Sequence, residues 1–136
     1  MQVEIKNQVY DLYFGLDALD YLNRAYTLTS EESGTTNLNP IIGQGLNFMY
    51  TGLESENPVA VGNFIKAGTN TLKSKPSNKD IDDFIGGHIL EGTLSDFIQE
   101  SIDFLKECPL TRRAVSKGEG VGGKKPKTRK KPATSD

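Results

Sequence analysis

Cysteine and histidine each occur once in this chain of 136 residues, and tryptophan does not occur. A single cysteine, Cys108, excludes an internal disulfide framework and is typical of a protein of the reducing cytoplasm. A single histidine, His88, has no further residues at zinc-ligand spacing and no nucleophile placed beside it for a Ser–His–Asp arrangement. We therefore predict that both side chains pack in the body and that the protein is not an enzyme, with no catalytic, cofactor-binding or metal-binding residue.

Long apolar stretches are missing as well. The hydrophobic fraction is 35%, below the roughly 45–50% of globular domains, a figure that also counts glycine. No run approaches the roughly 18–20 apolar residues of a membrane span. The first residues, MQVEIKNQVY, lack the basic segment and apolar core of a secretory signal. We expect neither a membrane segment nor a secretory signal.

The formal net charge of −2 hides a split along the chain. Residues 109–136 hold nine basic and two acidic residues, a net charge of +7, whereas residues 1–108 hold seven basic and sixteen acidic residues, a net charge of −9. Glycine, proline and lysine dominate the second segment, which leaves almost nothing to bury against its ordering entropy. The sequence thus predicts a folded domain at residues 1–108 and a disordered basic tail at residues 109–136.

The first residues predict a β-hairpin. Apolar and polar residues alternate over residues 2–14, and Lys6-Asn7-Gln8 interrupts them with an asparagine that tolerates turn conformations. The second strand carries apolar residues on both faces: Tyr10, Leu12 and Phe14 on one, and Val9 and Tyr13 on the other. That strand is either covered on both faces or leaves one face for a partner.

Five short helices follow, predicted at about residues 16–25, 40–53, 58–72, 78–91 and 94–108. An Asn-Pro pair opens the second and the third, because proline fits the first position of a helix. The polar stretch at residues 27–39 predicts a loop, or a short strand around residues 26–28. The predicted fold class is therefore α+β, mainly α-helical, with an N-terminal hairpin, about five short helices and the basic tail.

The last two helices have the clearest signals. Ser77 or Asn78 can cap the first, Thr93 can cap the second with Asp96 three residues later, and Gly92 separates the two. Each carries an apolar stripe at helical spacing: Ile81, Phe84, Ile85, His88 and Ile89 in the first, and Leu94, Phe97, Ile98, Ser101, Ile102 and Leu105 in the second. Neither helix buries its stripe alone, so the rest of the body or a partner protein must supply the opposing surface.

Three charged or glycine-rich motifs have competing interpretations. Asp80, Asp82 and Asp83 lack the pattern of a calcium loop, and negative charge at a helix start explains them better than a cation site. The glycine run at residues 118–123 lacks the GxxxxGK[ST] order of a phosphate loop. The lysine-rich end, KKPKTRKK, attracts polyanions but has no aromatic residues for base stacking, so a solvated tail and nucleic-acid contact are both open.

Three segments resemble the tail assembly chaperone family of long-tailed, siphovirus-type bacteriophages that infect Gram-positive hosts. They are the N-terminal QVEIKNQVYDLYFGLDALDYLN, the Asn39-Pro40-Ile41-Ile42 helix start, and NKDIDDFIGGHILEG, which leads into the final helix. The resemblance covers about residues 1–108. It rests on the pattern of the chain, since no catalytic motif defines the family.

The resemblance implies a non-enzymatic assembly factor of the host cell cytoplasm, absent from the mature virion. It would bind the tape measure protein, keep it soluble and promote polymerisation of the tail tube around it. The major tail tube protein and a second copy of the chain are further implied partners. The family often makes a longer form by −1 ribosomal frameshifting, for which the codons of Gly123-Lys124-Lys125 or Arg129-Lys130-Lys131 are candidates. The alternative is a small nucleic-acid-associated or regulatory protein that uses its basic arm.

The predicted partner-binding residues are Ile42, Phe48, Met49 and Tyr50. They lie on a predicted helix that is apolar nearly all round and so has more apolar surface than one core needs. A helical segment of the tape measure protein with an apolar stripe would pack on that surface. In the alternative, these residues pack inside the body or in a homo-oligomer.

Overall fold

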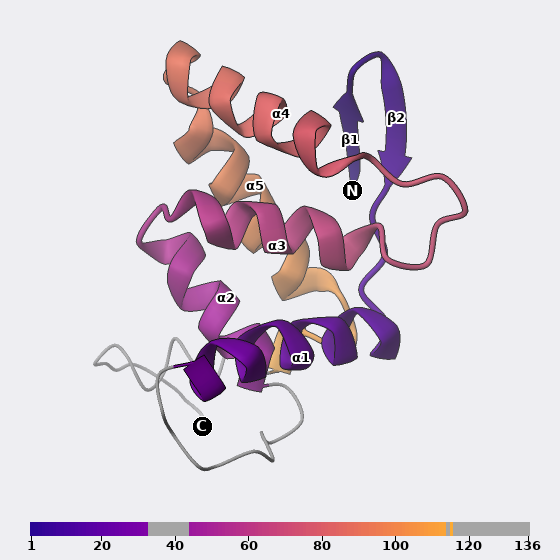
Figure 1. The fold of residues 1–136 in the computed structure, drawn as a ribbon, viewed down its shortest axis with the longest axis vertical. Helices are drawn as coiled ribbons and strands as arrows, with labels where there is room; N and C mark the ends of the chain where they lie inside the picture. The colour runs from indigo at the N-terminus through magenta and orange to yellow at the C-terminus, as the bar shows by residue number, and fades with distance from the viewer. Residues whose placement is uncertain (33–43, 114, 116–136) are drawn as a thin grey trace, which may run out of the picture.

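A computed structural model describes residues 1–32, 44–113 and 115 of the chain. In that part the chain forms a two-stranded antiparallel sheet followed by five helices (Figure 1). The elements are β1 (Gln2–Ile5), β2 (Gln8–Asp11), α1 (Leu16–Glu32), α2 (Gln44–Glu54), α3 (Pro58–Gly68), α4 (Asn78–Glu91) and α5 (Leu94–Glu107). The predicted fold class, α+β and mainly helical with an N-terminal hairpin, is confirmed.

The hairpin forms where its sequence predicts, although its second strand is shorter. Lys6 and Asn7 connect β1 to β2, with φ angles of 53° and 66°. Positive φ at both turn residues is typical of the type I′ turn, whose twist matches that of the flanking strands. β2 ends at Asp11 because the chain then turns to α3, where the Tyr13 N–H donates to the carbonyl oxygen of Gly68 at 3.0 Å.

One face of this N-terminal segment is covered and the other is open. In residues 8–14 the buried side chains are Tyr10, Leu12 and Phe14. Val9 and Tyr13 on the other face are 57% and 64% exposed. The sequence leaves open whether this strand is covered on both faces or on one. In the structure only one face is covered, and the other is open to solvent.

α1 extends to Glu32, so the loop predicted from residue 27 and the alternative strand at residues 26–28 are wrong for this segment. Two tertiary contacts hold the helix in its second half. The Tyr26 ring stacks on Phe48 of α2 with ring centroids 5.7 Å apart, and the Tyr26 hydroxyl accepts a hydrogen bond from Asn63 of α3 at 3.1 Å. Such contacts outweigh the modest helix propensity of the threonine and serine residues that follow.

Two other helix boundaries differ from, or fall outside, what the sequence predicts. Residues 33–43, which include the predicted helix start at Asn39-Pro40, lie outside the described residues, and α2 is described from Gln44. α3 ends at Gly68 and not near residue 72. The Gly68 carbonyl oxygen accepts from the Tyr13 N–H, so the chain leaves the helix at its contact with the hairpin.

α3 starts at the predicted Asn57-Pro58 pair, and the predicted caps of α4 are present. The Asn57 side chain accepts from the Val59 N–H at 2.9 Å at the start of α3, and the Ser77 hydroxyl accepts from the Asp80 N–H at 3.0 Å at the start of α4. Gly92 ends α4 in the left-handed conformation, with a φ of 73°. The Asn57 and Ser77 side chains each satisfy a backbone N–H that has no partner within its helix.

Thr93 occupies the N-cap position of α5, as predicted, but its side chain makes no cap hydrogen bond, so the predicted capping box with Asp96 is wrong. The Thr93 hydroxyl oxygen instead lies 2.6 Å from Nδ1 of His88. The His88 ring also packs against Phe84 and Phe97, with ring centroids 4.7 and 5.4 Å away. The expected half-buried core histidine is confirmed, and it engages the hydroxyl that the sequence assigns to the cap.

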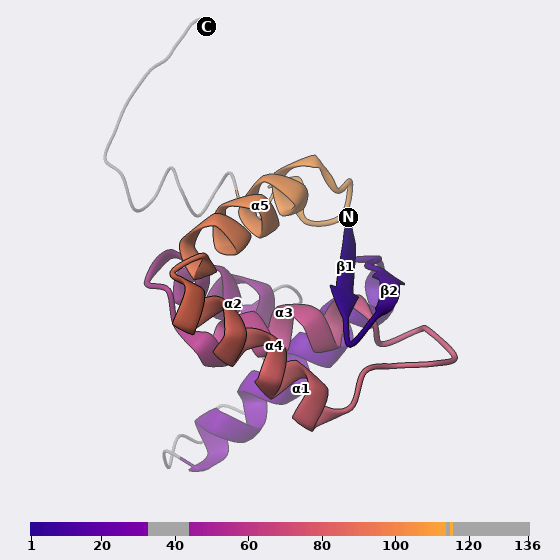
Figure 2. The same ribbon diagram turned by 90° about the horizontal axis from the view of Figure 1, so that it is seen from above.

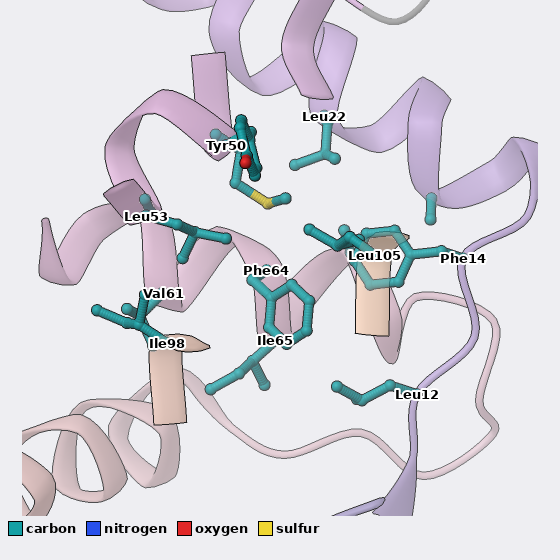
Figure 3. Close-up of a cluster of buried hydrophobic side chains, with 14 of the residues drawn as sticks. Leu12, Phe14, Leu22, Tyr50, Leu53, Val61, Phe64, Ile65, Ile98 and Leu105 are labelled. Carbon is teal, nitrogen blue, oxygen red and sulfur yellow. The ribbon is translucent and has the colours of Figure 1, made fainter. Parts of the chain in front are cut away.

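α3 lies at the centre of the body, and Figure 1 shows it between α1 and α4. Its Phe64 has no exposed surface and stacks on Phe14, with ring centroids 5.3 Å apart. Phe97 and Phe104 of α5 meet the same ring edge-on, each at 6.3 Å. Figure 3 shows Phe64 among buried side chains of the hairpin segment, α2, α3 and α5. One core therefore joins these parts of the chain.

Packing continues beyond the predicted domain boundary at residue 108. Thr111 and Val115 are buried, and the Thr111 hydroxyl donates to the carbonyl oxygen of Leu105 at 2.6 Å. The division of the chain at residue 108 stays a prediction, but the packed body includes these two residues. The rest of the predicted disordered tail, residues 114 and 116–136, lies outside the described residues.

Candidate interaction surfaces

The four predicted partner-binding residues have different positions. Met49 is fully buried and Tyr50 is 4% exposed, so both belong to the core and are not directly accessible to a partner in this structure. Phe48 is 48% exposed. Ile42 lies outside the described residues. The internal-packing alternative therefore describes Met49 and Tyr50, while a partner-binding role for Phe48 and Ile42 stays a prediction.

Phe48 already has a partner within the chain, because it stacks on Tyr26 across the contact between α1 and α2. Burial raises the pKa of Tyr26, although the hydrogen bond with Asn63 lowers it in part. The Tyr26 hydroxyl therefore stays protonated at neutral pH, and it links the stacked pair of rings to α3 through Asn63. Phe48 is half-exposed and does not by itself make an extended apolar surface.

A first groove lies between α2 and α5 and has a volume of about 360 Å³. Its lining residues are Tyr50, Leu53, Glu54, Glu56, Ser95, Ile98, Gln99, Ile102 and Lys106. Most of the exposed atoms around it are polar, and the Ser95 hydroxyl donates to Oε2 of Glu56 at 2.9 Å across it. The groove is therefore a poor match for an apolar side chain of a partner.

A second groove lies between α3 and α4, has a volume of about 370 Å³ and is mainly apolar. Its lining residues are Pro58, Val59, Gly62, Asn63, Lys66, Ile81, Asp82, Ile85, Gly86 and Ile89. On each helix these residues recur one turn apart, so the groove follows both helices. We call it the α3–α4 groove. Its length and composition suit the side chains of a helical segment.

Exposed apolar residues gather at one end of the α3–α4 groove. Val59 is 67% exposed and Ile89 is 50% exposed, and both line the groove. Leu90, the next residue of α4, is 89% exposed. The sequence places Ile89 on the buried stripe of its helix and does not single out Val59 or Leu90. A signal that could have found Leu90 is the Gly86-Gly87-His88-Ile89-Leu90 run, in which two glycines come shortly before two consecutive aliphatic residues. Nothing in the sequence distinguishes Val59.

The remaining reactive side chains serve the fold. Cys108 is half-buried and packs against the core, and burial raises the pKa of its thiol, which disfavours the reactive thiolate. Among the described residues, no group of three or more His, Cys, Asp or Glu residues is placed to hold a metal ion. None of the described helices combines the length and the hydropathy that a membrane span needs.

Lys6 joins the hairpin turn to the start of α4. Its Nζ lies 3.1 Å from Oδ2 of Asp83 and 3.6 Å from Oδ1 of Asp80, and Lys79 Nζ lies 3.1 Å from the same oxygen of Asp83. Hydrogen bonds from Lys79 and then from Lys6 lower the pKa of Asp83, and the bond to Asp83 raises the pKa of Lys6. These aspartates therefore hold the hairpin on α4 as well as lying at a helix start.

Replacing Lys6 with glutamine should lower the thermal midpoint slightly, within a limited pH window. Because folding lowers the pKa of Asp83, its ion pair stabilises the folded protein fully above 3.8, the pKa in the unfolded chain. This stabilisation is lost as the pH falls through the lower pKa of the folded protein. Because folding raises the pKa of Lys6, its ion pair stabilises the folded protein fully below 10.5, the pKa in the unfolded chain. This stabilisation is lost as the pH rises through the higher pKa of the folded protein. Melting both proteins across pH at low and high salt tests this, since salt should shrink the difference. An equal difference at about pH 2, where carboxylates are protonated, would contradict it.

The described residues thus form a small helical protein with apolar side chains exposed along a groove between two helices, a geometry suited to binding another polypeptide. The chain belongs to the family described as phage tail assembly chaperone protein, TAC, whose model matches residues 2–119. No curated protein and no solved structure matches the chain. The family match confirms the resemblance to tail assembly chaperones, over a segment that includes the buried Thr111 and Val115.

Proposed function

We propose that this tail assembly chaperone binds the tape measure protein of its phage, keeps that protein soluble and promotes polymerisation of the tail tube around it. Membership of the chaperone family supports a role in tail assembly. The observation that carries the proposal is the apolar α3–α4 groove with Val59, Ile89 and Leu90 exposed beside it. A monomer has no evident use for such a surface, whereas a chaperone needs one to cover apolar segments of another chain.

The proposed mechanism needs no chemical step, which agrees with the proposal that the protein is not an enzyme. A long helical client exposes apolar stripes that would associate with one another before assembly. Covering a stripe removes apolar area from water, at about 25 cal/mol for each Å². Because the groove is short and open, each contact is weak enough for tube subunits to displace it as they polymerise. The major tail tube protein is therefore a second proposed partner.

The proposal places this activity in the cytoplasm of the infected cell, before the virion is complete, in a siphovirus-type phage of a Gram-positive host. A longer form made by frameshifting near the lysine-rich end is part of the same proposal. The codons for residues 123–125 and 129–131 test that part, because codons that cannot form a slippery heptamer would remove it.

Co-expression of the full chain with overlapping fragments of the tape measure protein tests the function. We expect at least one otherwise insoluble fragment to move into the soluble fraction and to co-purify with the chain. An unrelated protein expressed at the same level is the control for a general effect of expression. If no fragment becomes soluble or co-purifies, the proposed function is wrong.

The alternative function, nucleic-acid association through the basic tail, makes a different prediction. It requires binding in a gel shift at physiological salt that is lost when the tail is removed. The deletion should begin at residue 117, because Thr111 and Val115 are part of the core. Binding that depends on the tail, together with no effect on the tape measure fragments, would favour the alternative.

A further inference from the structure

No contact within the described part of the chain requires a glycine at position 86 of α4. Glycine in the interior of a helix is less favourable than alanine by about 1 kcal/mol. Two other helical glycines are closely packed: an added Cβ would lie 2.4 Å from the Leu22 backbone at Gly45, and 3.0 Å from the Phe14 side chain at Gly68. An added Cβ at Gly86 would meet nothing within 4 Å. The space above Gly86 is open, and it lies in the α3–α4 groove.

The apolar end of the groove surrounds this open position. Ile89 and Leu90 follow Gly86 by three and four residues, so they lie about one turn further along the same side of α4. Val59 faces this end from α3. Val59, Gly86 and Ile89 therefore line this end of the groove, and Leu90 is exposed beside it. A helix that crosses α4 at Gly86 can approach its backbone closely and place apolar side chains against the three apolar residues.

Carboxylates outnumber cationic side chains beside this end of the α3–α4 groove, whose own charged lining residues are Lys66, two turns along α3 from Val59, and Asp82. The hydrogen bond from Ser95 to Glu56 brings the turn between α4 and α5 against the turn between α2 and α3 (Figure 2). These two turns and their immediate neighbours carry four carboxylates: Glu54, Glu56, Glu91 and Asp96. Lys106 lines the α2–α5 groove with Glu54 and Glu56, so the five charged side chains of this region have a net charge of −3. A cationic partner is therefore attracted to this end of the groove.

Resting on the proposed function, we propose that the segment of the tape measure protein that docks here is a basic amphipathic α-helix. It crosses α4 at Gly86, places its apolar stripe against Val59, Ile89 and Leu90, and carries lysine or arginine beside the stripe, towards the acidic turns. The tail of this chain has the matching charge but not the matching stripe, since residues 116–136 contain one valine and no larger aliphatic or aromatic residue. Apolar fit and charge together select the client helix.

A pair of glycine variants of the full chain tests the proposal. Gly86→Gln fills the crossing point, whereas Gly87→Gln adds the same side chain to the next residue, which is also open but does not line the groove. Both variants should fold with an unchanged or higher thermal midpoint, because glutamine favours helix more than glycine does. The probe is the set of overlapping tape measure peptides, ranked by helical amphipathicity and positive charge, with affinity measured by calorimetry.

We expect Gly86→Gln to weaken binding of the basic amphipathic peptides about tenfold or more, and Gly87→Gln to change it less than about twofold. Leu90→Gln should weaken it as well, and rising salt should weaken binding to the unmodified chain. If the unmodified chain binds peptides and both glycine variants bind them equally well, this inference fails while the proposed function stands. If the unmodified chain binds no peptide, both fail. The inference is also overturned if Gly86→Gln dissociates a dimer of the chain, or if removal of residues 117–136 alone frees the groove for peptides of any charge.

Discussion

Replacing Phe64 with alanine should lower the free energy of unfolding by about 3–5 kcal/mol. Phe64 is fully buried at the centre of the core, and its ring contacts those of Phe14, Phe97 and Phe104. The substitution leaves a cavity among three rings that come from the hairpin segment and α5, and neither segment can move in to fill it without losing its other contacts. A domain of this size has a total stability of about 5–15 kcal/mol, so this loss removes a large part of it.

Urea unfolding followed by circular dichroism measures this effect. Phe48→Ala is the matched control, because it removes the same ring from a position that is 48% exposed and has Tyr26 as its ring partner. We expect the control to cost about 1–2 kcal/mol, in proportion to its partial burial. Equal losses for the two variants would contradict the assignment of Phe64 to the centre of the core.

Replacing Gly45 with valine should lower the free energy of unfolding by about 3 kcal/mol, at the upper end of the typical cost of overpacking. A Cβ at Gly45 would lie 2.4 Å from both the carbonyl carbon and the carbonyl oxygen of Leu22. The Gly45 N–H also donates to Oδ1 of Asn23 at 2.9 Å, which holds the start of α2 against α1. Because the obstacle is backbone, no side-chain rotation relieves it, and the two helices must separate.

Gly86→Ala is the control for this second prediction, since it adds a Cβ to another helical glycine. There the added atom meets nothing, so the variant should be more stable than the unmodified protein by up to about 1 kcal/mol. Thermal and urea unfolding of the two variants should therefore move in opposite directions. A neutral Gly45→Val variant would show that α1 and α2 do not approach at this position in solution.

These core variants also help to interpret the binding experiments. Phe64→Ala and Gly45→Val should lose binding only as far as they lose folded protein, because neither residue lines the α3–α4 groove. Gly86→Gln should lose binding while the protein stays folded. Comparing the fraction folded with the fraction bound therefore separates a structural effect from an effect on the docking surface.

Local signals in the sequence predicted several elements correctly. The turn at Lys6 and Asn7, the start of α3 at Asn57-Pro58, the cap at Ser77 and the glycine end of α4 at Gly92 all depend on interactions within a few residues. The buried stripe of α5 also follows directly from its helical periodicity, because one face of that helix is polar. The family resemblance, which the match over residues 2–119 confirms, depends on the same order of local elements.

Other features depended on which segments meet in space. α1 continues beyond Tyr26 because Phe48 and Asn63 contact the Tyr26 side chain. α3 ends at Gly68 because the Tyr13 N–H donates a hydrogen bond to the Gly68 carbonyl oxygen. In each case a tertiary contact competes with a local preference worth about 1 kcal/mol or less, and the tertiary contact prevails.

The sequence by itself determined that this chain is a mainly helical protein with an N-terminal hairpin, an acidic body and a basic end, because composition, periodicity and caps are properties of short segments. Only the tertiary structure decided which apolar residues remain exposed after the core has formed. α2 is apolar on several sides, and the arrangement of its neighbours buries Met49 and Tyr50. α4 presents an apolar stripe that the sequence treats as one face, yet Ile81 and Ile85 on it are buried and Ile89 is exposed. Whether an apolar face belongs to the core or to a partner depends on what lies opposite it, and that is settled by residues distant in the chain.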